Sequence, residues 1–344
     1  MRWKNRPEGS NWGDFGPDDQ VGRLNWLGPE QVKKGVAEVQ EGRTFCLSMP
    51  LDYPGGNILN PARHPPQRFA TRSPDGTDRY LLAMADAQKN AELTDVVNDD
   101  RVMIHNQYSS QWDALAHVGG LFDADGDGVP EKVFYNGWRG GEHIVERAPS
   151  PDYPGLTATE ATRLGIETMA ETCIQGRAVM IDLHAEYGEA HEDVGLDGLE
   201  AVMSKQGVQV EKGDLVMLHT GWTKLMLDME KNPSKEMLHA SCTALEGRDP
   251  KLQDWIRDSG LVALISDNYA VERAPSRTGA GQRPMLPIHE LCLFKLGIPL
   301  AEIWWLGDLA AYFRESGRNR CLLTAPPLRL PGAVGSPVMP VATV

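Results

Sequence analysis

The stretch GRAVMIDL at residues 176–183 is a short and almost continuous apolar run. Such a run is typical of a strand that is buried on both faces of a parallel sheet. The segments KGDLVMLHTGW at 212–222 and LVALISDNYAVE at 261–272 repeat the pattern, with polar residues where each run ends. Because helix-like segments separate the strand-like runs, we predict an α/β fold whose chemistry lies at the strand ends.

The segments around these strands complete the expected domain. GPEQVKKGVAEVQEGR at 28–43 predicts a helix that ends near Gly42, and TFCLSMPL at 44–51 predicts the strand that follows it. TATEATRLGIETMAETC at 157–173 predicts another helix, capped by threonine. No linker is long or polar enough to divide the chain, so we predict a single domain over 1–344, with 1–70 as an N-terminal arm packed on the core.

The composition is that of an ordinary globular protein. A net charge of -14, with no local cluster of lysine and arginine, argues against nucleic acid as a partner. No apolar run approaches the roughly 18 residues that span a bilayer, and the N-terminus lacks the apolar core of a secretion signal. Five cysteines without a CxxC pair indicate reduced thiols. We therefore expect a cytoplasmic protein with no membrane partner.

Several common catalytic and binding signatures are absent from the sequence. There is no G-x-G-x-x-G, P-loop or G-x-S-x-G motif, and no H-E-x-x-H pair is complete. DADGDG at 123–128 begins like a calcium-binding loop, but Phe134 occupies the twelfth position, where a bidentate glutamate should stand. A polar surface turn is the alternative interpretation of this loop.

The stretch QYSSQWDALAH at 107–117 carries the first candidate site. It places Asp113 and His117 four residues apart, so that a helix or a tight turn would put both side chains on one face. This is the spacing of a metal-binding or acid/base pair. The upstream positions, where further imidazoles would complete a metal site, carry Gln107 and Gln111.

A second segment supplies more possible ligands. PIHELCLFKLGIPLAEIWWLGDL at 287–309 predicts a short helix from Pro287 to Gly297, with His289 in its first turn, followed by an apolar strand that contains Glu302. A carboxylate is costly to bury in an apolar strand without a cation beside it. That cation could be a metal ion or an arginine.

Together these segments resemble the cyclase family of metal-dependent hydrolases, which includes bacterial kynurenine formamidases, isatin hydrolases and cyclic imide hydrolases. The family motif H-x-G-T-H-x-D-x-P-x-H aligns without gaps to 107–117, and a later histidine and glutamate match His289 and Glu302. The segments at 11–32, 42–56, 134–137, 212–222 and 265–272 also look like family landmarks in the expected order. The resemblance implies a swivelling β/β/α fold, a homodimer or homotetramer, and hydrolysis of an amide, imide or related acyl bond.

This chain departs from the family motif at both of the histidines that precede the aspartate, which are Gln107 and Gln111 here. In two-metal relatives those histidines and the aspartate hold one ion, while the aspartate, the later histidine and the glutamate hold the other. We therefore expect one divalent ion on Asp113, His289 and Glu302, because two carboxylates neutralise its charge. An oxygen from Gln111 would be a fourth ligand and would favour Mn²⁺ over Zn²⁺.

The leading functional hypothesis is a metal-dependent hydrolase acting on an amide, cyclic imide or lactam-like carbonyl of a small molecule. His117 would serve as general acid/base, because imidazole titrates near 6.5 and can both accept and donate a proton. A lyase, dehydratase or lactonase on the same metal site is one alternative. A non-catalytic small-molecule binding protein is another, although a pure binder has no need of His117.

The remaining candidates are possible substrate contacts: Trp112, Gln107, His219 and Tyr269. His219 and Tyr269 stand at predicted strand exits, and Trp112 could line an aromatic pocket. Tryptophans in such strands more often belong to the core, and glutamines on a polar turn are usually solvated or bonded to backbone. The sequence leaves these alternatives open.

Overall fold

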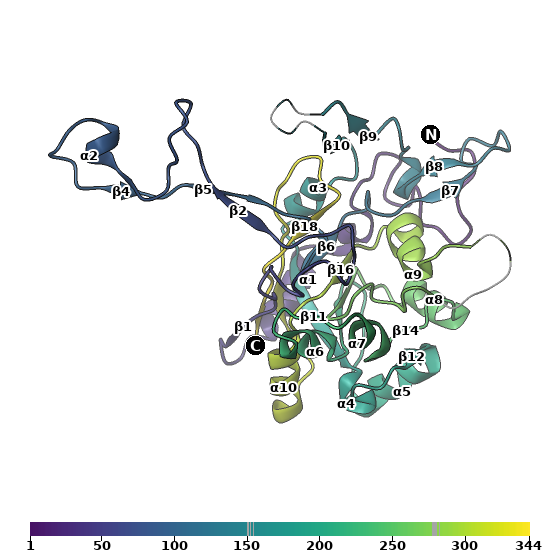
Figure 1. Cartoon of the computed structure of the whole chain (residues 1–344). Coiled ribbons are helices and arrows are strands. Elements are labelled where there is room, and N and C mark those ends of the chain that lie inside the picture. The colour runs from purple at the N-terminus through teal and green to yellow at the C-terminus, as the bar shows by residue number, and fades with distance from the viewer. Residues whose placement is uncertain (150, 152, 154, 277–280, 282) are drawn as a thin grey trace.

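The computed structural model describes the whole chain except residues 150, 152, 154, 277–280 and 282. A nine-stranded sheet forms its centre, in the order β1-β19-β17-β11-β13-β15-β16-β6-β18 (Figure 1). These strands are β1 (Thr44–Cys46), β6 (Gln111–Asp113), β11 (Gln175–Asp182), β13 (Leu215–His219), β15 (Ala263–Ser266), β16 (Leu300–Glu302), β17 (Arg320–Thr324), β18 (Gly335–Pro337) and β19 (Val341–Thr343). The α/β fold expected from the sequence is confirmed.

The middle of the sheet is parallel, because β11, β13, β15 and β16 pair in the same direction. β17 joins one side of this group antiparallel, and β6 joins the other side antiparallel. Nearly every residue of the four parallel strands is buried. Helices cover both faces of such strands, which explains why the sequence runs are apolar throughout instead of alternating.

Helices pack on both faces of the sheet. One face shares its core with α5 (Leu196–Gln206), α8 (Pro250–Asp258) and the π-helix η3 (Glu290–Leu296). The opposite face shares its core with α3 (Ile166–Glu171), α10 (Gly307–Ser316) and the 3₁₀ helix η1 (Gly22–Trp26). The other helices are α1 (Pro29–Ala37), α2 (Met84–Ala87), α4 (His184–Tyr187), α6 (Trp222–Asp228), α7 (Lys235–Ala240), α9 (Pro287–His289) and the 3₁₀ turn η2 (Tyr135–Gly137).

The N-terminal residues are part of the packed body. Trp3, Trp12 and Leu24 are buried, and the indole N–H of Trp12 donates to the carbonyl of Phe294 at 2.8 Å. The rings of Trp12 and Phe294 meet edge to face, with centroids 5.2 Å apart. Because Trp3 and Trp12 share a core with η3 and Leu24 packs in the core on the other face of the sheet, we keep the prediction that 1–344 is one domain.

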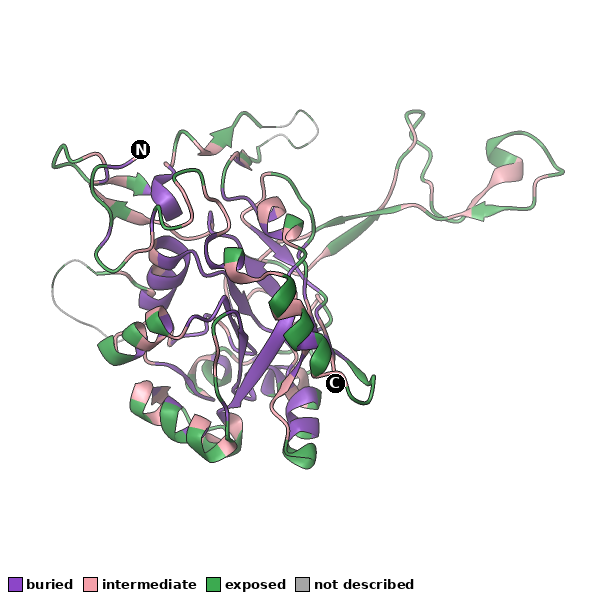
Figure 2. Ribbon diagram, turned by 180° about the vertical axis from the view of Figure 1, so that it is seen from behind, coloured by how far each residue is buried: buried purple, intermediate pink, exposed green. Residues whose placement is uncertain are grey.

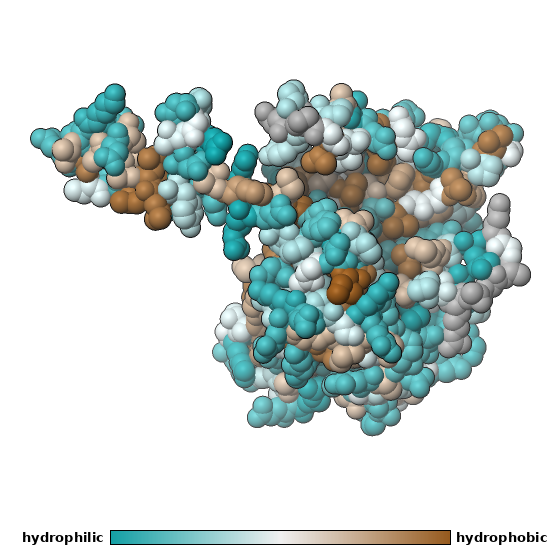
Figure 3. Space-filling model, in the orientation of Figure 1, coloured by the Kyte–Doolittle hydropathy of each residue, from teal (hydrophilic) through white to brown (hydrophobic). Residues whose placement is uncertain are grey.

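A long ribbon projects from this body between residues 67 and 103 (Figures 1 and 2). It consists of the antiparallel pairs β2 (Gln67–Ala70) with β5 (Asp100–Met103) and β3 (Leu82–Ala83) with β4 (Val96–Val97), and it includes α2. No residue from 67 to 103 is buried. Apolar side chains gather around β4 on its surface (Figure 3). The sequence analysis did not predict this ribbon.

Smaller hairpins and bridges complete the structure: β7 (Gly120–Phe122) with β8 (Glu131–Val133), β9 (Ile144–Arg147) with β10 (Ala158–Ala161), and β12 (Asp193–Val194) with β14 (Ala244–Leu245). The helix predicted over 157–173 is wrong in its first part, because Ala158–Ala161 pairs with β9 and α3 begins only at Ile166. In the part of the chain that the structure describes, no helix has the length and apolarity to cross a membrane.

Candidate metal centre

Strand pairing brings three of the predicted site residues to one face of the sheet. β6 runs antiparallel to β16, with Gln111 opposite Glu302 and Asp113 opposite Leu300. Side chains that are opposite in register project from the same side of a sheet, as do residues two apart on one strand. Gln111, Asp113 and Glu302 therefore share one face. The helix that was one option for 107–117 is wrong, because Gln111–Asp113 is extended.

His289 joins this group from the end of α9. Its Nε2 atom lies 3.1 Å from Oε1 of Glu302. Asp113, His289 and Glu302 each offer one ligand atom, and these atoms all lie within 4.8 Å of one another. All three side chains are buried. The structure thus brings together the three residues expected to hold a metal, at a spacing that one ion can bridge.

A further carboxylate, Glu272, supports His289 from behind. The Oε1 atom of Glu272 lies 3.0 Å from Nδ1 of His289 and accepts the backbone N–H of His289 at 2.9 Å. A partner of this kind fixes the orientation of an imidazole and leaves its other nitrogen for a metal. Glu272 was not among the predicted site residues, although it ends the segment LVALISDNYAVE at 261–272. A carboxylate six residues beyond a buried strand was the available signal.

The two glutamates change the proton affinity of the cluster. Burial alone lowers the pKa of His289, but hydrogen bonds with Glu272 and Glu302 outweigh it and raise the pKa to about 10. Burial favours the neutral form of Glu302, yet the hydrogen bond with His289 holds the pKa of Glu302 below its usual range. Burial raises the pKa of Asp113. A protonated His289 and a divalent ion are therefore alternative cations for these carboxylates.

Two buried atoms at this cluster favour a cation of some kind. Among the described residues, Asp113 Oδ2 and Gln111 Oε1 are buried and have no hydrogen-bond partner. Buried polar atoms without a partner are uncommon and require an explanation. Two carboxylates and an imidazole are a suitable donor set for a divalent ion, which would satisfy Asp113 Oδ2 directly. The residues present therefore fit one divalent metal.

Gln111 contacts the cluster as a hydrogen-bond donor. Its Nε2 atom donates to Glu302 Oε2 at 3.1 Å and lies 3.4 Å from Asp113 Oδ1. Its Oε1 atom has no hydrogen-bond partner among the described residues. A half-turn of the amide would exchange the two atoms, and only that rotamer would make Gln111 an oxygen ligand.

His117 lies at the edge of the cluster. Its backbone N–H donates to the carbonyl of Ala114 at 2.8 Å, so a tight turn follows β6 and carries the imidazole back toward the strand. The Nε2 atom of His117 is 3.8 Å from Asp113 Oδ1, and the side chain is 21% exposed. His117 is thus close to the candidate metal ligands and also reaches solvent, as a proton-transfer group must.

Gln107 packs beside the same strand. A Cβ atom on Gly335, which pairs with Asp113, would lie only 2.3 Å from Gln107 Nε2. That Nε2 atom is buried and has no hydrogen-bond partner in the described chain. The backbone carbonyl of Gln107 accepts from Nη1 of Arg63 at 2.7 Å. Sequence reasoning did not select Arg63, because nothing in a proline-rich loop indicated which residue would turn toward the site.

Trp112 and His219 lie on the opposite face of the sheet from the cluster. Trp112 alternates with Gln111 and Asp113 on β6; it is fully buried, and its indole donates to the carbonyl of Ala325 at 2.8 Å. The pairing of β13 with β15 aligns Leu218 with Ser266, and in the register of β15 with β16 Ser266 falls level with Glu302. Leu218 therefore shares the face of Glu302, and His219, the next residue, lies on the other face. These two candidates are not brought to the metal ligands.

His219 belongs instead to a separate buried ion network. Its Nδ1 atom lies 2.7 Å from Asp182 Oδ1, and Arg314 of α10 contacts the other oxygen of Asp182 at 2.5 Å. Burial alone would raise the pKa of Asp182, but the hydrogen bond with His219 and the charge of Arg314 hold this pKa below its usual range. Asp267 accepts three hydrogen bonds from Thr220 and Gly221 nearby. This network ties α10 and the strand ends together.

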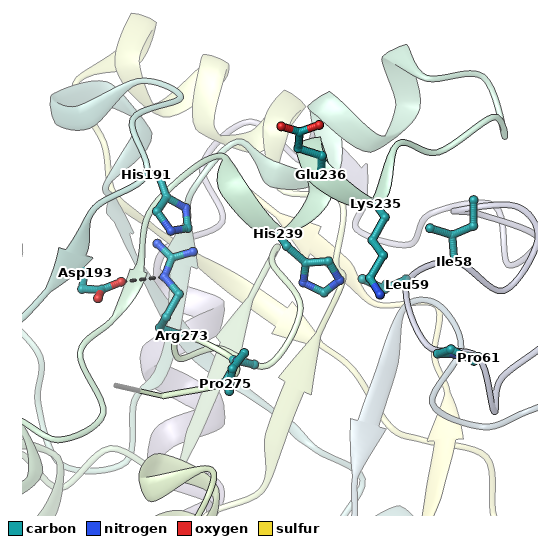
Figure 4. A pocket seen from close by; sticks show the side chains of 11 residues that line it. Ile58, Leu59, Pro61, His191, Asp193, Lys235, Glu236, His239, Arg273 and Pro275 are labelled. Carbon is teal, nitrogen blue, oxygen red and sulfur yellow. Dashed lines mark hydrogen bonds and ion pairs between the residues drawn. The ribbon is translucent and has the colours of Figure 1, made fainter. Parts of the chain in front are cut away.

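An open cavity of about 920 Å³ lies at the surface (Figure 4). Its lining combines an apolar side with a polar one: Ile58, Leu59, Pro61, His191, Asp193, Lys235, Glu236, His239, Arg273, Ala274 and Pro275. A smaller pocket shares His239 and Arg273 with it and is lined by Glu272 and Tyr269. Tyr269 therefore lines the same small pocket as Glu272, the residue that supports His289.

The acidic turn at 123–131 offers a second group of carboxylates, from Asp123, Asp125 and Glu131. Asp123 accepts the backbone N–H groups of Gly126 and Gly128, which is the bonding of a polar turn. Glu131 contacts the guanidinium of Arg139. The carboxylates thus already have protein partners, as in the surface-turn interpretation.

Comparison with known proteins agrees with this architecture. The chain matches the Cyclase family model over residues 46–273, which is more than half of its length. A solved structure described as a novel cyclase is 29% identical, with a TM-score of 0.73, and 97% of each chain is covered. No curated protein matches the chain.

More distant structures share the fold. Isatin hydrolase A from Labrenzia aggregata, solved with benzyl benzoate, is 13% identical with a TM-score of 0.53, and the match covers 87% of this chain and 93% of that one. Isatin hydrolase A from Ralstonia solanacearum is 16% identical with a TM-score of 0.53, and the match covers 87% and 91%. Because the family model matches well over half of the chain, this chain belongs to the cyclase family.

Proposed function

We propose that this protein is a metal-dependent hydrolase that cleaves an amide, cyclic imide or lactam-like carbonyl of a small molecule. One divalent ion, Mn²⁺ or Zn²⁺, would be held by Asp113, His289 and Glu302. The observation that carries the proposal is the convergence of these three buried side chains, with ligand atoms within 4.8 Å of one another. Family membership supports the reaction class.

Side chains around that ion would transfer the proton and orient the metal ligands. When bound, the ion would polarise the substrate carbonyl and lower the pKa of a coordinated water from about 15.7 toward about 7. His117 is close enough to Asp113, at 3.8 Å, to take a proton from the attacking water and pass it to the leaving nitrogen. Glu272 holds Nδ1 of His289, which directs Nε2 to the ion.

Metal content and product mass test this proposal. Purification without added metal, followed by mass spectrometry of bound metals, should find close to one equivalent of Mn²⁺ or Zn²⁺. Less than about half an equivalent would favour the non-catalytic binding protein. A panel of N-formyl amines, cyclic imides, isatin-like lactams and lactones should then give products that have gained water. Products that have lost a group would identify a lyase or dehydratase on the same site.

Substitution of the ligands gives a second test. Asp113→Ala, His289→Ala and Glu302→Ala should each lose metal and activity together, because two protein ligands would remain. Glu315→Ala, an exposed glutamate of α10, is the control and should keep both. Full metal content in all three ligand variants would contradict the assignment.

We also propose that the protein forms a homodimer or homotetramer. The ribbon at 67–103 has no buried residue, and an isolated two-stranded ribbon is only marginally stable in water. Its exposed apolar side chains include Phe69, Leu81 and Val102. Light scattering during size-exclusion chromatography should give a mass of two or four chains, and a monomer would contradict the proposal.

A further inference from the structure

Arg63 is a cationic side chain near the metal cluster. It lies in the segment that leads into the ribbon, and Gln107 lies just beyond the ribbon's return strand, so the two meet at the ribbon's base. Nη1 of Arg63 donates to the backbone carbonyl of Gln107 at 2.7 Å. A guanidinium carries five N–H groups, so most of its donors remain available.

The described part of the chain provides Arg63 with no carboxylate within ion-pair distance. Its positive charge nevertheless acts on Asp113 and Glu302, because it favours the ionised form of both carboxyl groups and so opposes the burial that raises the pKa of Asp113. In a protein of net charge -14, a half-buried arginine without an acidic partner is unusual and suits an anionic ligand.

Other donors point to the same place. Arg63, Gln107 and Tyr269 line one small cavity of about 10 Å³. The Nε2 atom of Gln107 is buried without a partner in the described chain, and its donors are therefore unused. The hydroxyl of Tyr269 accepts from Asn60 at 3.5 Å, which leaves its own proton free to donate. The cavity has room for a group about the size of one water molecule, such as a single ligand oxygen.

This cavity adjoins the proposed reaction centre. Gly335 faces Asp113 across the β18 and β6 pair, and the Gln107 amide lies directly against Gly335. The cavity shares Leu59 with the large open cavity, where Lys235 and His239 point inward from α7 (Figure 4). The open cavity and the small cavity thus share a wall at Leu59.

We propose that Arg63, with Gln107 and Tyr269, forms a subsite for a carboxylate oxygen, so that the preferred substrate is an anionic acyl compound with a carboxylate near the scissile carbonyl. This inference rests on the proposed hydrolase function. An arginine suits this role because its planar fork matches a carboxylate. The unused amide of Gln107 supplies a second donor to the bound oxygen.

A pair of matched amides tests the subsite in the metal-loaded protein. Succinamate carries a carboxylate separated from its amide carbonyl by two methylene groups, and butyramide has the same four-carbon chain without the charge. Arg63→Gln should raise KM for succinamate about 10- to 100-fold and change KM for butyramide less than about threefold. Arg329→Gln, an exposed arginine that lies outside the ribbon and pairs with Glu171 at the surface, is the matched control and should change neither. Equal effects on both amides, or no effect, would overturn the subsite.

A binding measurement keeps the subsite testable without turnover. Calorimetry with succinate should give at least tenfold weaker binding to Arg63→Gln than to the wild type, with Arg63→Lys between them because it keeps the charge and loses the fork. Equal affinity for the wild type and Arg63→Gln overturns the inference. If the metal-loaded wild type hydrolyses neither amide nor any compound of the panel, the proposed function fails, while the calorimetry still decides the subsite separately.

Discussion

The Nδ1 atom of His289 lies 3.0 Å from Oε1 of Glu272, and the same oxygen accepts the backbone N–H of His289. One carboxylate oxygen thus fixes both the position of the residue and the rotation of its ring. The opposite ring nitrogen can then meet only Glu302 or whatever cation Glu302 holds.

Removal of the charge from Glu272 should weaken metal binding without abolishing it. In Glu272→Gln the three ligands remain, but the support for the His289 ring is weaker, and the dissociation constant for Zn²⁺ or Mn²⁺ should rise about 10- to 100-fold. Competition with a chromogenic chelator measures this change. Glu315→Gln, on the exposed side of α10, should leave the constant unaltered. An unaltered constant in Glu272→Gln itself would mean that His289 needs no such support.

The contrast between Glu272 and Glu302 shows what the sequence could predict. The apolar runs of β11, β13 and β15 identify parallel core strands, because both faces of such strands are buried. Glu302 stands inside a strand, where a charge is conspicuous. Glu272 follows β15 in an irregular segment, and its role depends on the contact that it makes with His289 at the end of α9. The pattern of neighbouring residues in the sequence does not predict such a tertiary contact.

Other misses have similar physical causes. The first part of the helix expected at 157–173 is wrong because Thr159 and Glu160 pair with residues of β9, so tertiary pairing overrode local propensity. His219 and Trp112 stood at suitable places in the sequence, yet strand alternation turned both to the other face. Asp113, His289 and Glu302 came from resemblance to a family motif, and pairing of β6 with β16 explains why residues so far apart meet.

Metal affinity should increase with pH because His289 must lose a proton to bind an ion. Its pKa is raised to about 10 by Glu272 and Glu302, so the imidazole is protonated below that pH when no metal competes. Between pH 6 and pH 8 the apparent association constant should rise about tenfold per pH unit, corresponding to one released proton. Chelator competition at several pH values provides the slope. A pH-independent constant would show that metal binding displaces no proton from this cluster.

Histidines at both glutamine positions should add a second ion. In Gln107→His/Gln111→His, the two imidazoles would join Asp113, because Gln111 already contacts that carboxylate and the Gln107 amide lies against Gly335 opposite it. Metal analysis of the double variant should approach two equivalents, compared with one in the wild type. A stoichiometry that stays at one would refute the inference that Gln107 and Gln111 are the reason this chain binds one ion where two-metal relatives bind two.

His117→Ala separates proton transfer from metal binding. The variant should keep its metal, because the three ligands are unchanged, and turnover should fall about 10²- to 10⁴-fold, the usual contribution of a positioned acid/base group. The pH profile of turnover should lose one ionisation in the variant. If the full profile survives, it belongs to another group, and if the metal is lost, His117 is itself a ligand. Its 3.8 Å distance from Asp113 would then shorten on metal binding.

Gly335 has no room for a larger side chain, because the Gln107 amide and the backbone of the paired strand β6 both lie close to its Cα. A Cβ there would lie 2.3 Å from Gln107 Nε2 and 2.9 Å from the backbone carbonyl of Trp112. Gly335→Ala should therefore displace the Gln107 side chain and destabilise the fold by about 1–3 kcal/mol, the usual cost of overpacking. Urea unfolding measures this loss.

The double variant Gly335→Ala/Gln107→Ala identifies the source of that cost. Truncation of Gln107 removes the nearer clash, whereas the carbonyl of Trp112 cannot move without breaking the pairing of β6 with β18. The double variant should therefore be less destabilised than the sum of the single variants, by about 0.5–3 kcal/mol. Strict additivity would mean that the backbone contact alone sets the cost, and that the Gln107 amide has room to move away from Asp113 without affecting the strand.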